Sequence, residues 1–131
     1  MTRQHLGYVA LLVRDYDKAK AWYCDVLGFN LIDDTLLPDG KRWVLVAPPG
    51  STETRLLLAK AATPVQAERV GDQAGGRVFL FLHTDDFWRD FRAMQAKAVQ
   101  FCEEPRQESY GMVAVFEDLY GNRWDLLQLA R

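Results

Sequence analysis

The pattern of hydrophobic residues repeats once along this chain, and this repeat constrains the fold more than any other sequence feature. A short apolar run is followed by a helical pattern and then by three further apolar runs, and the same order then returns in the second half. The expected strands are 6–13, 29–33, 42–47 and 54–59 in the first half, and 77–82, 99–102, 112–116 and 124–129 in the second. Each half is therefore predicted to be a βαβββ module.

An offset of 69 residues relates the two halves, because it places Val13 on Leu82, Asp15 on Thr84 and Trp22 on Phe91. Asp15 and Thr84 are candidate helix N-caps, and Gly28 is a candidate stop for the first helix. Neither module can cover both faces of its sheet alone. The predicted fold class is α+β, with two tandem modules that form a curved mixed sheet around a cavity.

Residues 61–75 interrupt the repeat with Ala-, Gln- and Gly-containing sequence, in which 65–70 could form at most a short helix. They are interpreted as a linker between module one (5–60) and module two (76–131). A chain of 131 residues, 49% of them hydrophobic, is long enough for one core but short for two independent ones. We therefore expect a single domain over residues 1–131.

Charge and cysteine content exclude several classes of function. Sixteen Lys and Arg residues stand against 18 Asp and Glu, which gives a net charge of −2 and no basic excess for nucleic acid. The apolar run at 8–13 is far shorter than the roughly 20 residues of a membrane span, and no signal-peptide core precedes it. Cys24 and Cys102 are far apart and are expected to be reduced thiols. The chain is predicted to be cytoplasmic, with neither nucleic acid nor membrane as a partner.

Two motifs carry a resemblance to a known family. One runs from Val13-Arg14-Asp15 through Ala21-Trp22-Tyr23 to Leu27-Gly28-Phe29, and the other is the turn at 116–122. Together with the duplicated modules, they resemble the vicinal oxygen chelate superfamily of glyoxalase I, extradiol dioxygenases and bleomycin-resistance proteins. Leu119 stands where the family's closing turn commonly has Pro. The resemblance implies that each module curls around a cavity, in which the family's enzymes hold a divalent metal on His and Glu side chains.

The residues at the family's ligand positions are unsuited to a metal. The resemblance places these positions on Tyr8, Arg55, Arg77 and Asp125, with an uncertainty of one residue for Arg55. A neutral phenol is a poor ligand, and arginine stays protonated and cannot ligate a cation. Only Asp125 keeps a carboxylate. No metal and no other cofactor is therefore predicted.

The same residues make a charge argument that is independent of the family. If Arg55, Arg77 and Asp125 face one cavity, their charges sum to +1, and an unpaired buried charge is costly. A nearby acid such as Glu117 or Asp118, a chloride, or a ligand with a carboxylate, phosphate or enolate oxygen would complete the set. The alternative is that the arginines form purely structural ion pairs.

Strand alternation predicts the rest of the cavity lining. It places Arg77, Phe79, Phe81 and His83 on one face, and Val78, Leu80 and Leu82 on the other, which is expected to meet a helix. An aromatic face with a cation and an imidazole suits a flat small molecule. Two alternatives stay open: that Phe79 and Phe81 fill the core, and that His83 satisfies a backbone group.

The predicted ligand-binding residues are Tyr8, Arg55, Arg77, Phe79, Phe81, His83 and Asp125. The predicted function is metal-free binding of an anionic or aromatic small molecule, as in the bleomycin-resistance branch, by a protein that pairs as a homodimer. A metal-dependent lyase or dioxygenase with non-standard ligands is the alternative, and whether the chain is an enzyme stays open. A third possibility is a structural subunit whose cavity is plugged by side chains. No catalytic residue is assigned.

Overall fold

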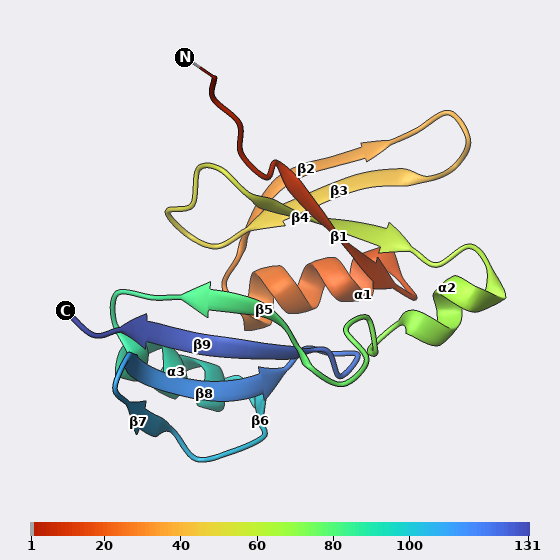
Figure 1. The fold of residues 1–131 in the computed structure, drawn as a ribbon. Coiled ribbons are helices and arrows are strands. Elements are labelled where there is room, and N and C mark those ends of the chain that lie inside the picture. The colour runs from red at the N-terminus through yellow and green to blue at the C-terminus, as the bar shows by residue number, and fades with distance from the viewer. Residues whose placement is uncertain (1) are drawn as a thin grey trace. The chain divides into compact units, whose positions relative to one another are not determined.

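The computed structural model describes residues 2–131 and consists of two compact units, Met1–Val70 and Gly71–Arg131. Each unit contains one mixed sheet with a helix packed on one of its faces (Figure 1). The boundary falls within the predicted linker, and each unit holds one βαβββ module. The predicted α+β class with duplicated modules is confirmed. None of the helices within residues 2–131 is long and apolar enough to cross a membrane.

The first unit has a four-stranded sheet in the order β1-β4-β3-β2. Strand β1 runs parallel to β4, and the other neighbours are antiparallel. Its elements are β1 (Tyr8–Val13), α1 (Tyr16–Ala21), the π-helical turn η1 (Trp22–Val26), β2 (Asn30–Leu36), β3 (Arg42–Ala47), β4 (Arg55–Lys60) and α2 (Pro64–Arg69). Helix α2 lies in the segment that was predicted as a linker with at most a short helix.

Helix α1 begins and ends as the sequence predicts. The Asp15 carboxylate accepts a hydrogen bond from the Lys18 backbone N–H at 2.8 Å, as an N-cap does. Gly28 follows η1 with φ of +82°, a conformation that favours glycine. Ala19 and Tyr23 are fully buried on the helical face. The buried sheet residues on the helix side are Leu11, Val13, Val44, Val46, Leu56 and Leu58, and Leu45 and Ala47 of β3 are buried on the other side.

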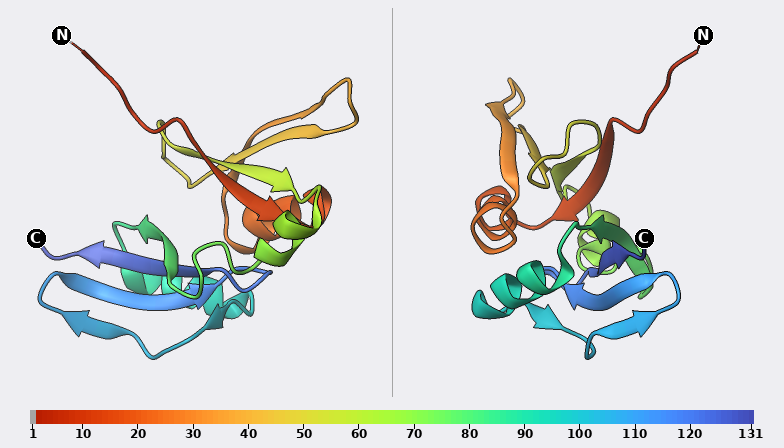
Figure 2. Two further views of the ribbon diagram at one scale, coloured as in Figure 1. Left: turned by 45° about the vertical axis from the view of Figure 1, so that its right-hand side comes forward. Right: turned by 90° about the vertical axis from the view of Figure 1, so that its left-hand side faces the viewer.

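The second unit repeats this plan with one addition. Its sheet has the order β5-β9-β8-β6, β5 is parallel to β9, and β7 also pairs with β8. The elements are β5 (Val78–His83), α3 (Phe87–Ala96), β6 (Gln100–Phe101), β7 (Arg106–Glu108), β8 (Gly111–Glu117) and β9 (Arg123–Leu129). Figure 2 shows α3 along one face of this sheet. Strand β7 was not predicted, because its sequence Arg-Gln-Glu has no apolar residue.

Two expectations for the second module are corrected. The N-cap of α3 is Asp86, whose carboxylate accepts from the Arg89 backbone N–H at 3.1 Å, and not Thr84. The Thr84 hydroxyl instead accepts from the Asp86 backbone N–H and donates to Asp90. Strand β5 begins at Val78, so Arg77 lies outside it. The constant offset of 69 does not hold, because β1 and β5 begin 70 residues apart, at Tyr8 and Val78, and the longer loop before α3 sets α1 and α3 71 residues apart.

The turn between β8 and β9 is built around the buried Asp118. Its carboxylate accepts hydrogen bonds from the backbone N–H groups of Tyr120 (2.9 Å) and Asn122 (3.0 Å) and from the Asn122 amide (2.9 Å). Asn122 in turn accepts from the Gln73 backbone N–H at 3.4 Å. A Cβ on Gly71, whose φ is +80°, would lie 2.0 Å from the Tyr120 carbonyl oxygen. This turn therefore fastens the start of the second unit to its last hairpin.

We expect Asp118→Ala to lower the free energy of unfolding by about 3 kcal/mol, because three donors lose a buried charged acceptor. Urea unfolding followed by circular dichroism measures the change. The control is Asp85→Ala, which removes an exposed ion pair with Arg89 and should cost at most about 1 kcal/mol. Equal losses for the two variants would contradict the structural role of Asp118.

Candidate binding site

The parallel pairing of β1 with β4 places two of the predicted site residues side by side. Tyr8 is directly opposite Arg55, which also settles the strand position of Arg55. Because side chains alternate along a strand, Ala10 and Leu12 of β1 and Leu57 and Ala59 of β4 share the face of Tyr8 and Arg55. The buried residues that pack on the helix side lie on the opposite face. We call the Tyr8 side of the sheet the first open face.

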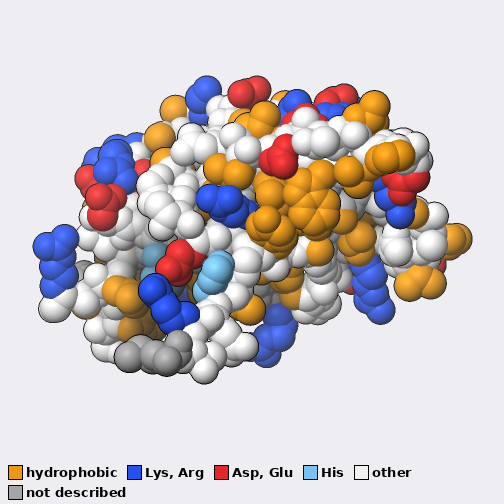
Figure 3. Space-filling view, turned by 90° about the horizontal axis from the view of Figure 1, so that it is seen from above, with side chains coloured by type: hydrophobic (Ala, Val, Ile, Leu, Met, Phe, Trp, Pro, Cys, Tyr) orange, Lys and Arg blue, Asp and Glu red, His pale blue; other side chains and the backbone are white. Residues whose placement is uncertain are grey.

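The first open face carries two aromatic rings and an arginine with one unsatisfied donor. The Tyr8 side chain is 52% exposed, and its ring lies edge-on to the Trp43 ring with centroids 5.7 Å apart. The Arg55 Nε atom is buried, and no hydrogen-bond acceptor within residues 2–131 reaches it. In Figure 3, hydrophobic side chains gather in a contiguous patch bordered by Lys or Arg and by Asp or Glu. This face combines apolar area with a donor that lacks an acceptor.

Three of the predicted residues lie on one face of the second sheet. Val78 is opposite Arg123 and Leu80 is opposite Trp124, so Phe79 is the extra residue of a β-bulge. Beyond the bulge Phe81 pairs with Asp125 and His83 pairs with Leu127. Alternation then places the side chains of Phe81, His83 and Asp125 on the side away from Leu80 and Leu82, whereas the bulge interrupts the alternation at Phe79. We call it the second open face.

The exposure of these residues argues against a purely structural role within their unit. Phe81 is 58% exposed and His83 is exposed, whereas Phe79 is partly buried. Leu80 and Leu82 lie opposite the buried Trp124 and Leu126, on the side that meets α3, as predicted. Val78 was expected on this side too, but it is opposite Arg123, on the face of Asp125, because of the bulge. Arg77 is exposed and precedes the strand, so the alternation that grouped it with Phe79 does not reach it.

Asp125 lies near a cation that the sequence did not reveal. Its Oδ1 is buried without a hydrogen-bond partner, and burial raises the pKa of this carboxyl, while Arg106 acts to lower it and Glu103 to raise it. Arg106 itself forms ion pairs with Glu103 at 3.0 Å and with Glu108 at 2.9 Å. Arg106 was missed because it lies on the unpredicted β7. The two charged residues at alternate positions, Arg106 and Glu108, were the sequence signal that could have indicated this strand.

Asp118 and Glu117 were the two acids considered as charge partners of the arginines. Asp118, one of the two candidates for completing the charge set, is held by the donors of its own turn. Glu117 ends β8 opposite Arg123. The excess positive charge expected from Arg55 is therefore not matched by Asp118.

A divalent metal does not fit the residues at the family's ligand positions. Within residues 2–131 no group of three or more His, Cys, Asp or Glu side chains comes together as a metal site would require. The side chains at the four positions are one phenol, two guanidinium groups and one carboxylate. Guanidinium groups have no free lone pair for a cation and repel it. The arrangement is suited to hydrogen bonding and ion pairing.

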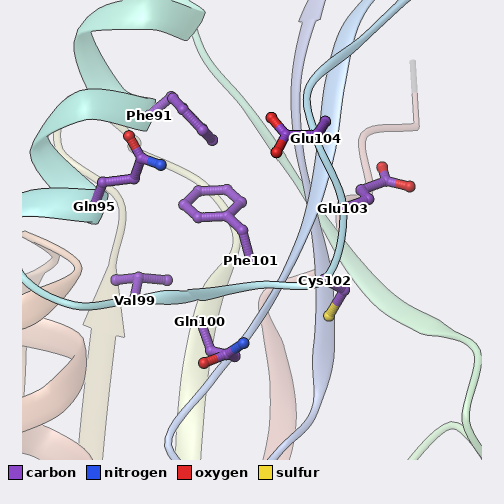
Figure 4. Close-up of a pocket in the computed structure, with 8 residues that line it drawn as sticks. All are labelled: Phe91, Gln95, Val99, Gln100, Phe101, Cys102, Glu103 and Glu104. Carbon is purple, nitrogen blue, oxygen red and sulfur yellow. The ribbon is translucent and has the colours of Figure 1, made fainter.

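The second unit also carries a groove of about 590 Å³ beside β6, on the α3 side of the sheet. The rings of Phe91 and Phe101, with centroids 4.6 Å apart, line it together with Val99. Figure 4 shows Glu103 and Glu104 projecting to different sides of the chain at one end of this groove. Because Phe101 is opposite Phe116 on the helix side, the groove is separate from the second open face.

The fold agrees with comparisons against known proteins. Residues 5–126 match the sequence profile of the Glyoxalase/Bleomycin resistance protein/Dioxygenase superfamily. The chain belongs to this superfamily. Within the superfamily, a protein of Shewanella frigidimarina (strain NCIMB 400) is 56% identical over 97% of this chain and 95% of its own length.

Two solved structures of the superfamily fold cover nearly the whole chain. UcmS2 is 28% identical, with a TM-score of 0.83 over 96% of this chain and 98% of its own. TnmS3, described as an antibiotic binding protein from Streptomyces sp. CB03234, is 32% identical, with a TM-score of 0.80 over 99% of both chains. The resemblance seen in the two sequence motifs is thus confirmed for the family and for the fold.

The raised pKa of Asp125 predicts a pH dependence of stability. A carboxyl whose pKa is higher in the folded than in the unfolded state makes folding less favourable as pH rises through that interval. Asp125→Asn removes this effect, so its stability relative to the unsubstituted protein should increase from acid to neutral pH. Urea unfolding at a series of pH values measures the difference, with the exposed Asp25→Asn as the control. A difference that is independent of pH, or equal to that of the control, would refute the burial argument.

Proposed function

We propose that this protein binds a flat aromatic or anionic small molecule without using a metal ion. The observation that carries the proposal is the buried, unpartnered Nε of Arg55, the strand partner of Tyr8, whose ring contacts the Trp43 ring. A buried donor without an acceptor costs free energy until a ligand supplies one. Ligand binding would therefore remove a cost that the free protein carries.

The chemistry of Arg55 favours an oxygen anion as the partner. A guanidinium group presents several N–H donors in a planar fork that matches a carboxylate or a phosphate. The neighbouring rings would contact the flat body of the same molecule, as in apolar pockets with few polar anchors. An aromatic acid or a phenolate-containing antibiotic has both features.

The second open face supports the aromatic part of the proposal. Phe81 and His83 expose a ring each, and Asp125 offers a carboxyl oxygen that accepts no hydrogen bond within residues 2–131. Phe79, at the bulge that precedes Leu80, stays in the proposed set. Arg77, exposed just before β5, remains in the proposed set as a positive charge near the start of that strand.

The comparison with TnmS3 supports small-molecule binding, because that protein is described as antibiotic binding and aligns with this chain over almost its full length. No donor set in the described chain favours the metal-dependent lyase or dioxygenase. We further propose a single cytoplasmic domain that pairs as a homodimer. Each sheet has unpaired outer strands, and β2 exposes Leu31, Ile32 and Leu36, which gives a physical reason for pairing.

Arg55→Met is expected to weaken an aromatic acid or antibiotic ligand by about tenfold to a hundredfold, the effect of losing a charged hydrogen bond. A thermal-shift screen of aromatic acids and antibiotics first identifies ligands, and calorimetry of the variant measures the loss. Arg3→Met, at an exposed residue outside every strand, is the matched control, and Arg77→Ala tests the residue before β5 separately. Unchanged affinity in Arg55→Met would refute the proposed anchor.

Exposure to metal ions tests the proposal that the protein works without a metal. Protein stripped of metal, incubated with Zn, Ni, Fe and Mn salts and passed through a desalting column should retain less than stoichiometric metal by elemental analysis. It should also show no turnover of the methylglyoxal–glutathione adduct or of catechols. Binding of one metal ion per chain, if Asp125→Asn abolished it, would contradict the claim that the residues at the family's ligand positions are unsuited to a metal.

A further inference from the structure

The groove beside β6 lies between α3 and the segment 99–104 that follows this helix. Its volume of about 590 Å³ is within the range of roughly 300 to 1,000 Å³ that small-molecule sites occupy. Phe91 and Gln95 line it from the helix, and Phe101 and Glu104 line it from the segment (Figure 4). The groove is therefore large enough for a small organic molecule.

The aromatic wall of this groove is on the opposite side of the sheet from the second open face. Phe101 pairs with Phe116 of β8, and the Phe116 ring stacks on the Trp124 ring. Trp124 in turn lies opposite Leu80, on the side of the sheet that meets α3. A ligand on this wall does not use the side chains of the second open face.

Two phenylalanine rings form the wall. The centroids of Phe91 and Phe101 are 4.6 Å apart, and their planes are tilted by 57°. Phe91 is buried, whereas Phe101 is half-buried. The face of an aromatic ring carries a partial negative charge, so it attracts a cation as well as an apolar group. The wall can therefore contact both the apolar body and the positive group of one ligand.

The charge at the groove is negative. Among the described residues, those that line it include Glu103 and Glu104 and no Lys, Arg or His. The Glu103 carboxylate binds Arg106 at 3.0 Å, and Arg106 also binds Glu108 at 2.9 Å, so this cation already faces two carboxylates. Glu104 is exposed and forms neither an ion pair nor a side-chain hydrogen bond within residues 2–131. The negative charge of Glu104 therefore remains uncompensated.

Glu104 and Gln95 face the aromatic wall from two sides. Figure 4 shows the Glu104 carboxylate turned toward the side on which Phe91 and Phe101 lie, whereas the Glu103 carboxylate points away. The Gln95 amide is directed toward Phe101 from α3. Gln95 is exposed, and its amide group forms no hydrogen bond within residues 2–131, so its oxygen can accept one from a ligand. The groove thus offers two oxygen acceptors beside aromatic rings.

We infer that this groove binds a small organic cation, an amine with an apolar body. The body packs against the rings of Phe91 and Phe101, and the ammonium group lies near the Glu104 carboxylate and the Gln95 amide oxygen. The uncompensated charge favours such a cation over a neutral molecule of the same shape, and it disfavours an anion. The site goes beyond the proposed function, because it takes a ligand of opposite charge on the other side of the sheet.

The test uses the full chain labelled with ¹⁵N and three probes of similar shape: phenethylamine, 2-phenylethanol and 3-phenylpropanoate. At neutral pH phenethylamine should shift the amide signals of Gln95, Val99 and Phe101, and added salt should weaken its binding. The neutral alcohol should bind more weakly at the same residues. The anionic 3-phenylpropanoate should cause no shift there.

Glu104→Gln should weaken phenethylamine by about threefold to fivefold and leave 2-phenylethanol unchanged, because it removes the charge and keeps the shape. The matched control is Glu68→Gln, which removes an exposed carboxylate of α2 in the first unit and should leave amine affinity unchanged. Phe101→Leu removes the ring and keeps an apolar side chain. It should lower the ratio of amine affinity to alcohol affinity by about twofold to fivefold.

Equal binding of the three probes, or equal effects of Glu104→Gln and Glu68→Gln, would overturn the inference. Amine-induced shifts confined to Phe81, His83 and Leu127 would also overturn it, because they would place the amine on the second open face. None of these results concerns the binding of an aromatic acid at Arg55, so the proposed function would stand or fall separately.

Discussion

The parallel pairing of the first and last strands of each module is the constraint on which both candidate faces depend. It joins β1 to β4 and β5 to β9, strands that are separated by a helix and two or more strands in sequence. Its register places Tyr8 beside Arg55 and Phe81 beside Asp125. Since a shift of one residue would turn these side chains toward the helices, the register determines what the open faces can bind.

The chemistry of these faces differs from that of a metal site, although the fold is that of the superfamily. Replacing ligands by guanidinium groups reverses the sign of the charge that a site prefers, and a divalent cation is then disfavoured while an oxygen anion is favoured. The second face is different again, because Arg106 is already shared by Glu103 and Glu108 and leaves the Asp125 oxygen without a donor. The two modules have thus kept one architecture with different polar groups.

Local signals in the sequence were sufficient for much of the fold. Strand β3 was predicted to the residue, and the cap at Asp15 and the stop at Gly28 were correct, because each depends on neighbouring residues alone. The errors came from longer-range assumptions. Thr84 was assigned as a cap by a constant offset, and Arg77 was assigned to a strand face across a region where a bulge at Phe79 interrupts the pairing. Arg106 was missed because pairing with β8, and not hydrophobicity, makes β7 a strand.

The central claim is that the Arg55 guanidinium takes the place of a metal as the partner of a ligand oxygen. The most direct measurement is the arginine Nε–H spectrum of ¹⁵N-labelled protein with and without an aromatic acid or antibiotic ligand found by screening. We expect the Arg55 Nε–H signal to move downfield and to exchange more slowly with water in the complex, as a donor does when it gains an acceptor. An unchanged Arg55 signal in a saturated complex would contradict it.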